Sequence, residues 1–95
     1  MEVRVRSIGP LQQILGGAKL DVTVRTGATI RDLLDQLAEE NGEEFAVHVR
    51  EPKEPVAYAP LRVVLNGRDL LPKQYRESLL TEADDVLIFT PIAGG

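Results

Sequence analysis

The chain has 95 residues, 43% of them hydrophobic and 27% charged, which is an ordinary composition for one folded domain with a single core. Its 15 acidic and 11 basic residues give a net charge of −4, so nonspecific binding to nucleic-acid phosphates or anionic membranes is disfavoured. The chain has no cysteine, which excludes disulfides, thiolate metal sites and thioesters carried on the chain.

The beginning of the chain predicts two strands that form a hairpin. Valine alternates with arginine over residues 2–7, which is the period of a half-buried strand. The pattern stops at Gly9, and after a short LQQIL segment two glycines turn the chain. Residues 20–24 alternate again and predict the second strand. Strands so close in sequence are expected to pair, although the connection between them is long.

One main helix is predicted to begin at Ile30. The hydroxyl of Thr29 can accept a hydrogen bond from an N-terminal amide, and Asp32 lies in the first turn, where the helix dipole favours negative charge. Apolar side chains recur at i, i+3, i+4 and i+7 from Ile30 to Leu37, which forms the apolar stripe of an amphipathic helix. Gly42 supplies the stop signal.

The middle of the chain predicts a second hairpin after an irregular connection. Prolines interrupt the weak alternation over residues 43–60, so most of this stretch is expected to lack regular structure. Residues 61–65 predict a strand, Asn66-Gly67 a tight turn, and residues 68–70 the returning strand.

The end of the chain completes an α+β arrangement. A single helical turn is expected over residues 73–78, an acidic turn over 82–85 and a last strand over 86–89. The order is therefore strand, strand, helix, strand, short strand, strand. One helix can cover one face of one sheet, which leaves the second face without an obvious cover.

The last strand is apolar on both of its faces. If Val86 and Ile88 lie under the helix, Leu87 and Phe89 must point to the other side. A central strand that is apolar on both sides explains Leu87 as well as a docking role does. Phe89 stands at the exit of the strand, which favours an exposed docking surface.

The internal side chains offer little catalytic chemistry. His48 is the only histidine, and no serine is placed to form a nucleophile and base pair with it, so we expect a satisfied or solvent-facing residue. No metal site is predicted, and the glycine pairs lack the spacing of a phosphate-binding loop. Solvated surface charge explains the acidic pairs Glu39-Glu40, Glu43-Glu44 and Asp84-Asp85.

The terminal carboxylate of Gly95 is the remaining reactive group. A carboxylate transfers its acyl group only after activation, for example as a mixed anhydride with AMP. Ala93, Gly94 and Gly95 form a thin thread that fits a narrow channel, and Pro91 prevents the sheet from continuing. A frayed terminus is the alternative, but the diglycine follows an apolar strand so closely that a functional tail is favoured.

The chain resembles the MoaD/ThiS family of ubiquitin-like sulphur carriers. The resemblance rests on the N-terminal strand pair, the helix opening at Thr29 after Gly27, the segment VVLNGRDL, the acidic turn and the terminus VLIFTPIAGG. It implies the β-grasp fold, a mixed four- to five-stranded sheet with parallel first and last strands in the middle and one helix across it. Residues 1–90 would form this domain and residues 91–95 a flexible tail.

The resemblance also implies a function without catalysis by the chain itself. An activating, adenylating enzyme uses ATP to adenylate the terminal glycine, and the acyl-adenylate is converted to a thiocarboxylate. In the molybdopterin branch the tail inserts into the large catalytic subunit of molybdopterin synthase and delivers sulphur to a cyclic pterin phosphate. The carrier binds no cofactor. Gly95 becomes the sulphur-bearing acyl carbon and Gly94 provides access, while docking falls to Leu87, Phe89, Pro91, Ile92 and Ala93.

Two departures from the family pattern are visible near the end of the chain. The family often has two prolines before its terminal segment, where this chain has Thr90-Pro91. A glycine is common in the last turn, where this chain has Ala83. Because alanine resists positive φ, we expect that turn to take another shape.

Several alternatives stay open. Carriers with an extended 43–60 segment also serve cysteine synthesis, tRNA thiolation or protein tagging, and a sulphur carrier for a thiamine pathway is a further alternative. A ubiquitin-like modifier would join Gly95 to lysines of target proteins. A plain interaction module with an incidental tail is a third reading. The longest run of large apolar residues, VLIF, is far too short for a membrane span, so a cytoplasmic protein without membrane or nucleic-acid partners is expected.

Overall fold

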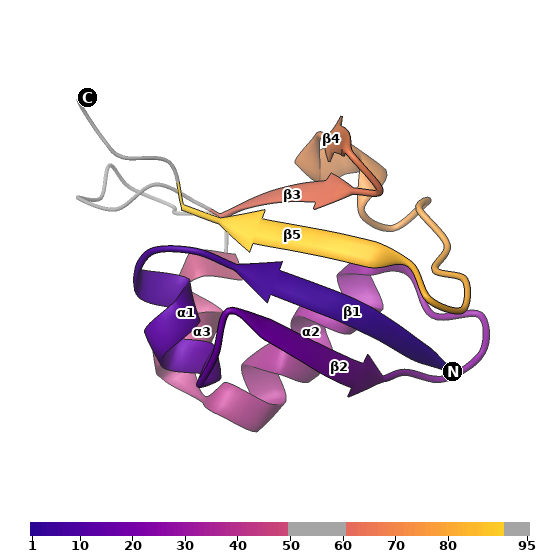
Figure 1. The fold of residues 1–95 in the computed structure, drawn as a ribbon. Helices are drawn as coiled ribbons and strands as arrows, with labels where there is room; N and C mark the ends of the chain where they lie inside the picture. The colour runs from indigo at the N-terminus through magenta and orange to yellow at the C-terminus, as the bar shows by residue number, and fades with distance from the viewer. Residues whose placement is uncertain (50–60, 91–95) are drawn as a thin grey trace.

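The computed structural model describes residues 1–49 and 61–90. These residues form strands and helices arranged as a sheet with helices against one of its faces (Figure 1). In chain order the elements are β1 (Glu2–Ser7), α1 (Pro10–Leu15), β2 (Lys19–Thr23), α2 (Ile30–Asn41), α3 (Glu43–Val49), β3 (Arg62–Leu65), β4 (Arg68–Leu70), the 3-10 helix η1 (Pro72–Gln74) and β5 (Asp85–Phe89).

The sheet has five strands in the order β2-β1-β5-β3-β4. The first and last of the described strands, β1 and β5, pair in parallel at its centre, and the other pairings among them are antiparallel. Figure 1 shows α2 running across one face of this sheet. The predicted α+β class and β-grasp topology are therefore confirmed.

The main helix α2 forms where its sequence signals predict. Thr29 and Asp32 make a reciprocal capping box: the Thr29 Oγ1 accepts from the Asp32 amide at 3.2 Å, and the Thr29 amide donates to the Asp32 Oδ2 at 2.9 Å. The hydrogen bond from the Thr29 backbone lowers the pKa of Asp32 below its ordinary value. The apolar stripe of α2 is buried against the sheet and consists of Ile30, Leu33, Leu34 and Leu37.

The prediction of an irregular connection directly after α2 was wrong. Residues 43–49 form helix α3, whose first turn closes on the Gly42 carbonyl through the amides of Phe45 and Ala46. The Phe45 side chain is completely buried. Burial of one large aromatic ring against the other helices therefore outweighs the weak alternation that suggested no helix. Residues 50–60 lie outside the described part of the chain.

The connection between β1 and β2 contains helix α1, which the sequence had left unassigned. Pro10 occupies its first turn, where a missing amide hydrogen costs nothing. Leu11 and Leu15 stand four residues apart and are both buried. Gly16 then ends the helix in the left-handed conformation, at φ 83°.

The second hairpin has the predicted tight turn. Asn66 and Gly67 both have positive φ, 49° and 84°, as the two central residues of a type I′ turn require. The helical turn that follows is η1, which lies at Pro72–Gln74 and so begins before the predicted 73–78 span.

The turn before β5 differs from its predicted shape. Ala83 adopts a φ of 66°, although a left-handed backbone costs a residue with a Cβ about 1–2 kcal/mol. Its amide donates to the Glu2 carbonyl at 2.9 Å, which ties the turn to the start of β1. The expectation that alanine would force another turn shape was therefore wrong.

Asp84 supplies much of what holds this strained turn in place. Its carboxylate accepts hydrogen bonds from the Thr81 amide at 2.7 Å, the Thr81 hydroxyl at 2.9 Å and the Asn66 amide nitrogen Nδ2 at 2.9 Å. The side chain is buried, so the explanation of Asp84 as solvated surface charge was wrong. Burial alone would raise the pKa of Asp84, but the hydrogen bonds from Asn66 and Thr81 outweigh it and lower that pKa.

Candidate functional site: the open face of the sheet

Strand β5 divides its side chains between the two faces of the sheet as predicted. Val86 and Ile88 have no exposed surface and belong to the core under the helices. Leu87 and Phe89 point to the opposite face, where both are only partly buried. We call this side, which the described helices do not cover, the open face (Figure 1).

An apolar strip runs along the open face beside β5. Val64 of β3 lies directly opposite Leu87 in the antiparallel register, and Arg62 lies opposite Phe89. Residues opposite one another in a sheet share a face. Val64, Leu87 and Phe89 therefore form one continuous group, called the apolar strip below. Sequence reasoning missed Val64 because its neighbour Val63 is equally apolar and only the strand pairing shows which of them faces outward.

Ion pairs hold charged side chains at both sides of the apolar strip. Arg6 of β1 donates to both carboxylate oxygens of Asp85, from Nε to Oδ1 at 2.9 Å and from Nη2 to Oδ2 at 2.6 Å. The hydrogen bond to Asp85 raises the pKa of Arg6 above its ordinary value. On the other side, Arg62 donates to the Asp69 carboxylate. These pairs fix planar guanidinium groups beside an apolar surface, which is a common composition for a protein interface.

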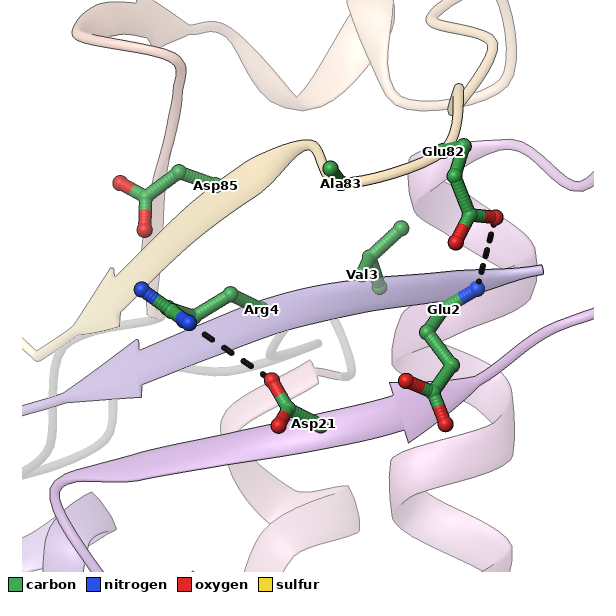
Figure 2. A pocket seen from close by; sticks show the side chains of 7 residues that line it. All are labelled: Glu2, Val3, Arg4, Asp21, Glu82, Ala83 and Asp85. Carbon is green, nitrogen blue, oxygen red and sulfur yellow. Dashed lines mark hydrogen bonds and ion pairs between the residues drawn. The ribbon is translucent and has the colours of Figure 1, made fainter.

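A shallow pocket lies at the opposite end of the open face, where β1 and β5 begin (Figure 2). Figure 2 shows Arg4 and Asp21 pointing toward one another, with Nε and Oδ1 at 3.8 Å. The Glu2 amide donates to the Glu82 Oε2 at 3.1 Å. Within residues 1–49 and 61–90, no group of histidine, aspartate and glutamate side chains is arranged to hold a metal ion.

One exposed apolar residue near this site was not singled out by the sequence. Ile8 directly follows β1, at the end of the sheet where β5 ends, and is 55% exposed. His48 belongs to α3, and its carbonyl accepts a hydrogen bond from the Leu61 amide at 3.1 Å. The predicted tail residues Pro91, Ile92, Ala93, Gly94 and Gly95 lie outside the described residues.

Solved structures share this fold over nearly their whole length. The solution structure of the HVO 2177 protein from Haloferax volcanii is 27% identical with a TM-score of 0.81, and the match covers 100% of this chain and 87% of that one. The crystal structure of SAMP1 from Haloferax volcanii is 21% identical with a TM-score of 0.75, covering 100% of both chains. A Pyrococcus furiosus protein assigned as molybdopterin converting factor, subunit 1, is 21% identical with a TM-score of 0.72, covering 96% of this chain and 98% of that one.

The other comparisons concern the sequence and its membrane character. No curated protein matches the sequence significantly. Among the helices that the structure describes, none has the length and apolar character needed to cross a bilayer. The model of the ThiS family matches residues 5–95, which is nearly the whole chain. Together with the β-grasp topology, this match shows that the chain belongs to the ThiS family of ubiquitin-like sulphur carriers.

Proposed function

We propose that this protein carries sulphur on Gly95 for the synthesis of molybdopterin, as the small subunit of molybdopterin synthase. The observation that carries the proposal is the extent of the family match, which runs from the sheet through the diglycine at residues 94 and 95. The likeness to the Pyrococcus furiosus molybdopterin converting factor subunit supports this branch of the family.

The proposed chemistry begins with activation of the Gly95 carboxylate. One carboxylate oxygen attacks the α-phosphate of ATP on an activating enzyme, pyrophosphate leaves, and an acyl-adenylate forms. A hydrosulphide equivalent from a sulphur donor then attacks the acyl carbon, AMP leaves with the oxygen, and a thiocarboxylate remains. Glycine suits both steps because no Cβ obstructs the acyl carbon. The enzyme supplies the catalytic groups, and the carrier binds no cofactor of its own.

The apolar strip is the proposed docking surface for the enzymes that handle the tail. Phe89 lies at the end of β5, so a partner that contacts Leu87 and Phe89 also holds the chain at the point from which the tail departs. Partly buried aromatic and aliphatic residues are already ordered in the free protein, which lowers the entropic cost of binding them. The large subunit of molybdopterin synthase and the activating enzyme would both use this surface.

Intact mass measurement tests the proposal directly. The protein is incubated with ATP, an activating enzyme of this family and a sulphide source, and its mass is measured before and after. We expect the replacement of one oxygen by sulphur at the C-terminus. The matched control is the same protein with one alanine appended after Gly95, which should stay unchanged because the acyl carbon is no longer that of glycine. An unchanged wild-type mass with an enzyme that thiocarboxylates its own carrier would contradict the proposal.

A covalent protein modifier is the second candidate, favoured by the likeness to SAMP1, a modifier protein, over the full length of both chains. Activation would be the same, but a target lysine would attack the acyl-adenylate or a thioester derived from it and form an isopeptide bond. Tagged protein expressed in its host distinguishes the two. A modifier accumulates in conjugates of higher mass, and a carrier returns with a free carboxylate after sulphur transfer.

A further inference from the structure

Strand β2 forms one edge of the sheet, and among the described strands it pairs only with β1 (Figure 1). At the two ends of this pairing, the Ser7 amide donates to the Ala18 carbonyl at 3.0 Å and the Val24 amide donates to the Met1 carbonyl at 2.8 Å. Because hydrogen-bonded and non-hydrogen-bonded pairs alternate in an antiparallel ladder, the even-numbered residues of β2 bond to β1. The backbone groups of its odd-numbered residues therefore face away from the sheet.

The open part of this edge runs from Lys19 to Asp21. Before it, the amide and the carbonyl of Gly17 are both hydrogen-bonded within the chain. After it, the Thr23 carbonyl accepts a hydrogen bond from the Gln36 Nε2 at 2.8 Å. Within the described part of the chain, no hydrogen bond reaches the outward amide or carbonyl of Lys19 or Asp21. These free donors and acceptors are a template for one short further strand.

The Lys19 side chain favours an acidic residue in such a strand. Lys19 lies directly opposite Arg6 of β1 in the register, and like charges in opposed positions destabilise a strand pair. Arg6 is paired with Asp85, and among the described residues no acidic side chain pairs with Lys19. An acidic side chain on the outer side of Lys19 would offset this repulsion.

The other two residues of the open edge complete the pattern. The Asp21 Oδ1 lies 3.8 Å from the Arg4 Nε, which is longer than a hydrogen bond, so the exposed carboxylate can still accept one from a second cation. Leu20 points to the covered side, where it lines a groove together with residues of α1 and α2. An antiparallel partner that matches all three residues reads basic, apolar, acidic along its own direction. That is the pattern of β2 itself.

We propose that two copies of this chain associate through β2, as an antiparallel strand pair with Leu20 opposite Leu20. In this register, Lys19 of each copy lies opposite Asp21 of the other. The outward backbone groups of these residues face one another, so each opposed pair exchanges two backbone hydrogen bonds. The free amides and carbonyls of Lys19 and Asp21 are then all satisfied, and the two-fold arrangement closes on itself.

The neighbouring symmetric registers are unfavourable. Centring the pair on Asp21 sets Asp21 opposite Asp21, and centring it on Lys19 sets Lys19 opposite Lys19, which are like-charge pairs. Two features weaken even the favoured register. Each copy has a net charge of −4, and Glu40 lines the groove beneath the edge, so two copies bring like charges to the same side. Small interfaces form transient complexes, and we expect a dissociation constant on the order of 1 mM.

This association leaves the proposed docking surface accessible. Strand β1 separates β2 from β5, so the apolar strip of each copy lies away from the shared edge. In the joined sheet the two β5 strands run in opposite directions. The pairing uses neither the tail nor its chemistry, and the inference therefore stands or fails separately from the proposed function.

The test is sedimentation equilibrium of the full chain, together with NMR of nitrogen-15-labelled protein, at concentrations from well below to above about 1 mM. We expect the average mass to rise toward that of two copies as the concentration increases. Chemical shifts should change in β2, and hydrogen exchange at the Lys19 and Asp21 amides should slow with increasing concentration. Spectra at the lowest concentration show whether each variant described below is folded.

Charge substitutions give the matched comparison. Lys19→Glu and Asp21→Lys should each weaken association by about tenfold or more, because both opposed pairs of the dimer become repulsive. The double variant restores opposite charges in the same register and should associate within about threefold of the wild type. Lys73→Glu changes the net charge as Lys19→Glu does, but at an exposed position in η1. It should also stay within about threefold of the wild type.

Several results would overturn the proposal. The protein would remain a monomer over the whole concentration range, or its shift changes would centre on the apolar strip instead of β2. A double variant as weak as the two single variants would show that Lys19 and Asp21 do not oppose one another. Stronger association of Asp21→Asn would indicate the register with Asp21 opposite Asp21. Deleting Gly95 should leave association unchanged, although it abolishes the substrate of the intact mass test.

Discussion

The two faces of the sheet differ most clearly within strand β5, where buried core residues alternate with residues that stay partly exposed. Val86 and Ile88 lose all exposure beneath the helices, whereas Leu87 and Phe89 stay partly accessible between ion pairs. Packing decides the residues on the covered face, since a close-packed interior tolerates little change in volume. Exposed ion pairs add little to stability, so the open face can vary its residues to suit a partner without losing the fold.

The largest effect is expected on the covered face. Ile88→Ala should lower the free energy of unfolding by about 2–5 kcal/mol, because it removes buried methyl groups and leaves a cavity. Leu87→Ala is the neighbouring control and should cost about 1 kcal/mol, since its side chain is only partly buried. Urea denaturation of both variants measures the difference. Equal losses of unfolding free energy at the two positions would show that packing does not distinguish the covered face from the open face.

Substitution of Phe89 should weaken docking to the activating enzyme more than it lowers the stability of the fold. Phe89→Ala is expected to leave the fold intact and to raise the KM of the activating enzyme for the carrier by about tenfold or more, as truncation of an interface anchor does. The control is Leu79→Ala, which removes a large apolar side chain that is 62% exposed away from the strip. If both variants weaken activation equally, general surface hydrophobicity rather than the apolar strip guides docking.

The turn before β5 directly precedes the strand whose residues divide between the two faces. Substitution of Asp84 tests how much the hydrogen bonds of its carboxylate stabilise that turn. Asp84→Asn should lower the free energy of unfolding by about 1–3 kcal/mol at neutral pH, because the NH2 group that replaces one carboxylate oxygen cannot accept a hydrogen bond, and at least one buried donor of Thr81 or Asn66 loses its acceptor. The folded pKa of Asp84 is lowered, so its contribution is present above the unfolded pKa of about 3.9 and is lost as pH falls through the folded value.

The urea midpoints of wild type and Asp84→Asn should therefore converge as the pH falls from about 5 to about 2. Glu39→Gln, at an exposed position on α2, serves as the control and should follow the wild type closely throughout. A difference between wild type and Asp84→Asn that stays constant over this range would show that the charge of Asp84 contributes nothing.

The smallest expected effect is an increase in stability. Ala83→Gly should raise the free energy of unfolding by about 0.5–1 kcal/mol, because glycine relieves the left-handed strain while adding freedom to the unfolded chain. Thermal and urea midpoints should both rise, and docking to the open face should be unaffected. A lower midpoint would mean that the methyl group of Ala83 makes a favourable contact that outweighs its backbone strain.

Local signals explain which elements the sequence predicted correctly. The capping pair Thr29 and Asp32 marks the start of α2, and Asn66-Gly67 marks the tight turn, because each acts within a few residues of itself. The division of β5 between two faces follows from the two-residue period of a strand. None of these features depends on knowing which distant segments lie nearby.

The errors occurred where distant contacts decide the structure. Helix α3 depends on burial of Phe45 in a core that gathers residues from the whole described chain, which a weak local pattern cannot reveal. The buried carboxylate of Asp84 accepts a hydrogen bond from Asn66, which belongs to another turn, and this distant partner cannot be read from the sequence around Asp84. The outward position of Val64 likewise follows from the pairing of β3 with β5, which no single segment specifies.

The central pairing of β1 with β5 has a consequence for how the protein is made. Strand β5 lies between β1 and β3 and is the last of the described strands in chain order. Because β1 and β3 do not pair with each other, the two halves of the sheet stay separate until β5 is present. A ribosome must therefore release almost the entire domain before the sheet can close. Such long-range closure slows folding. A molecule can complete its sheet only after synthesis has passed Phe89, where β5 ends.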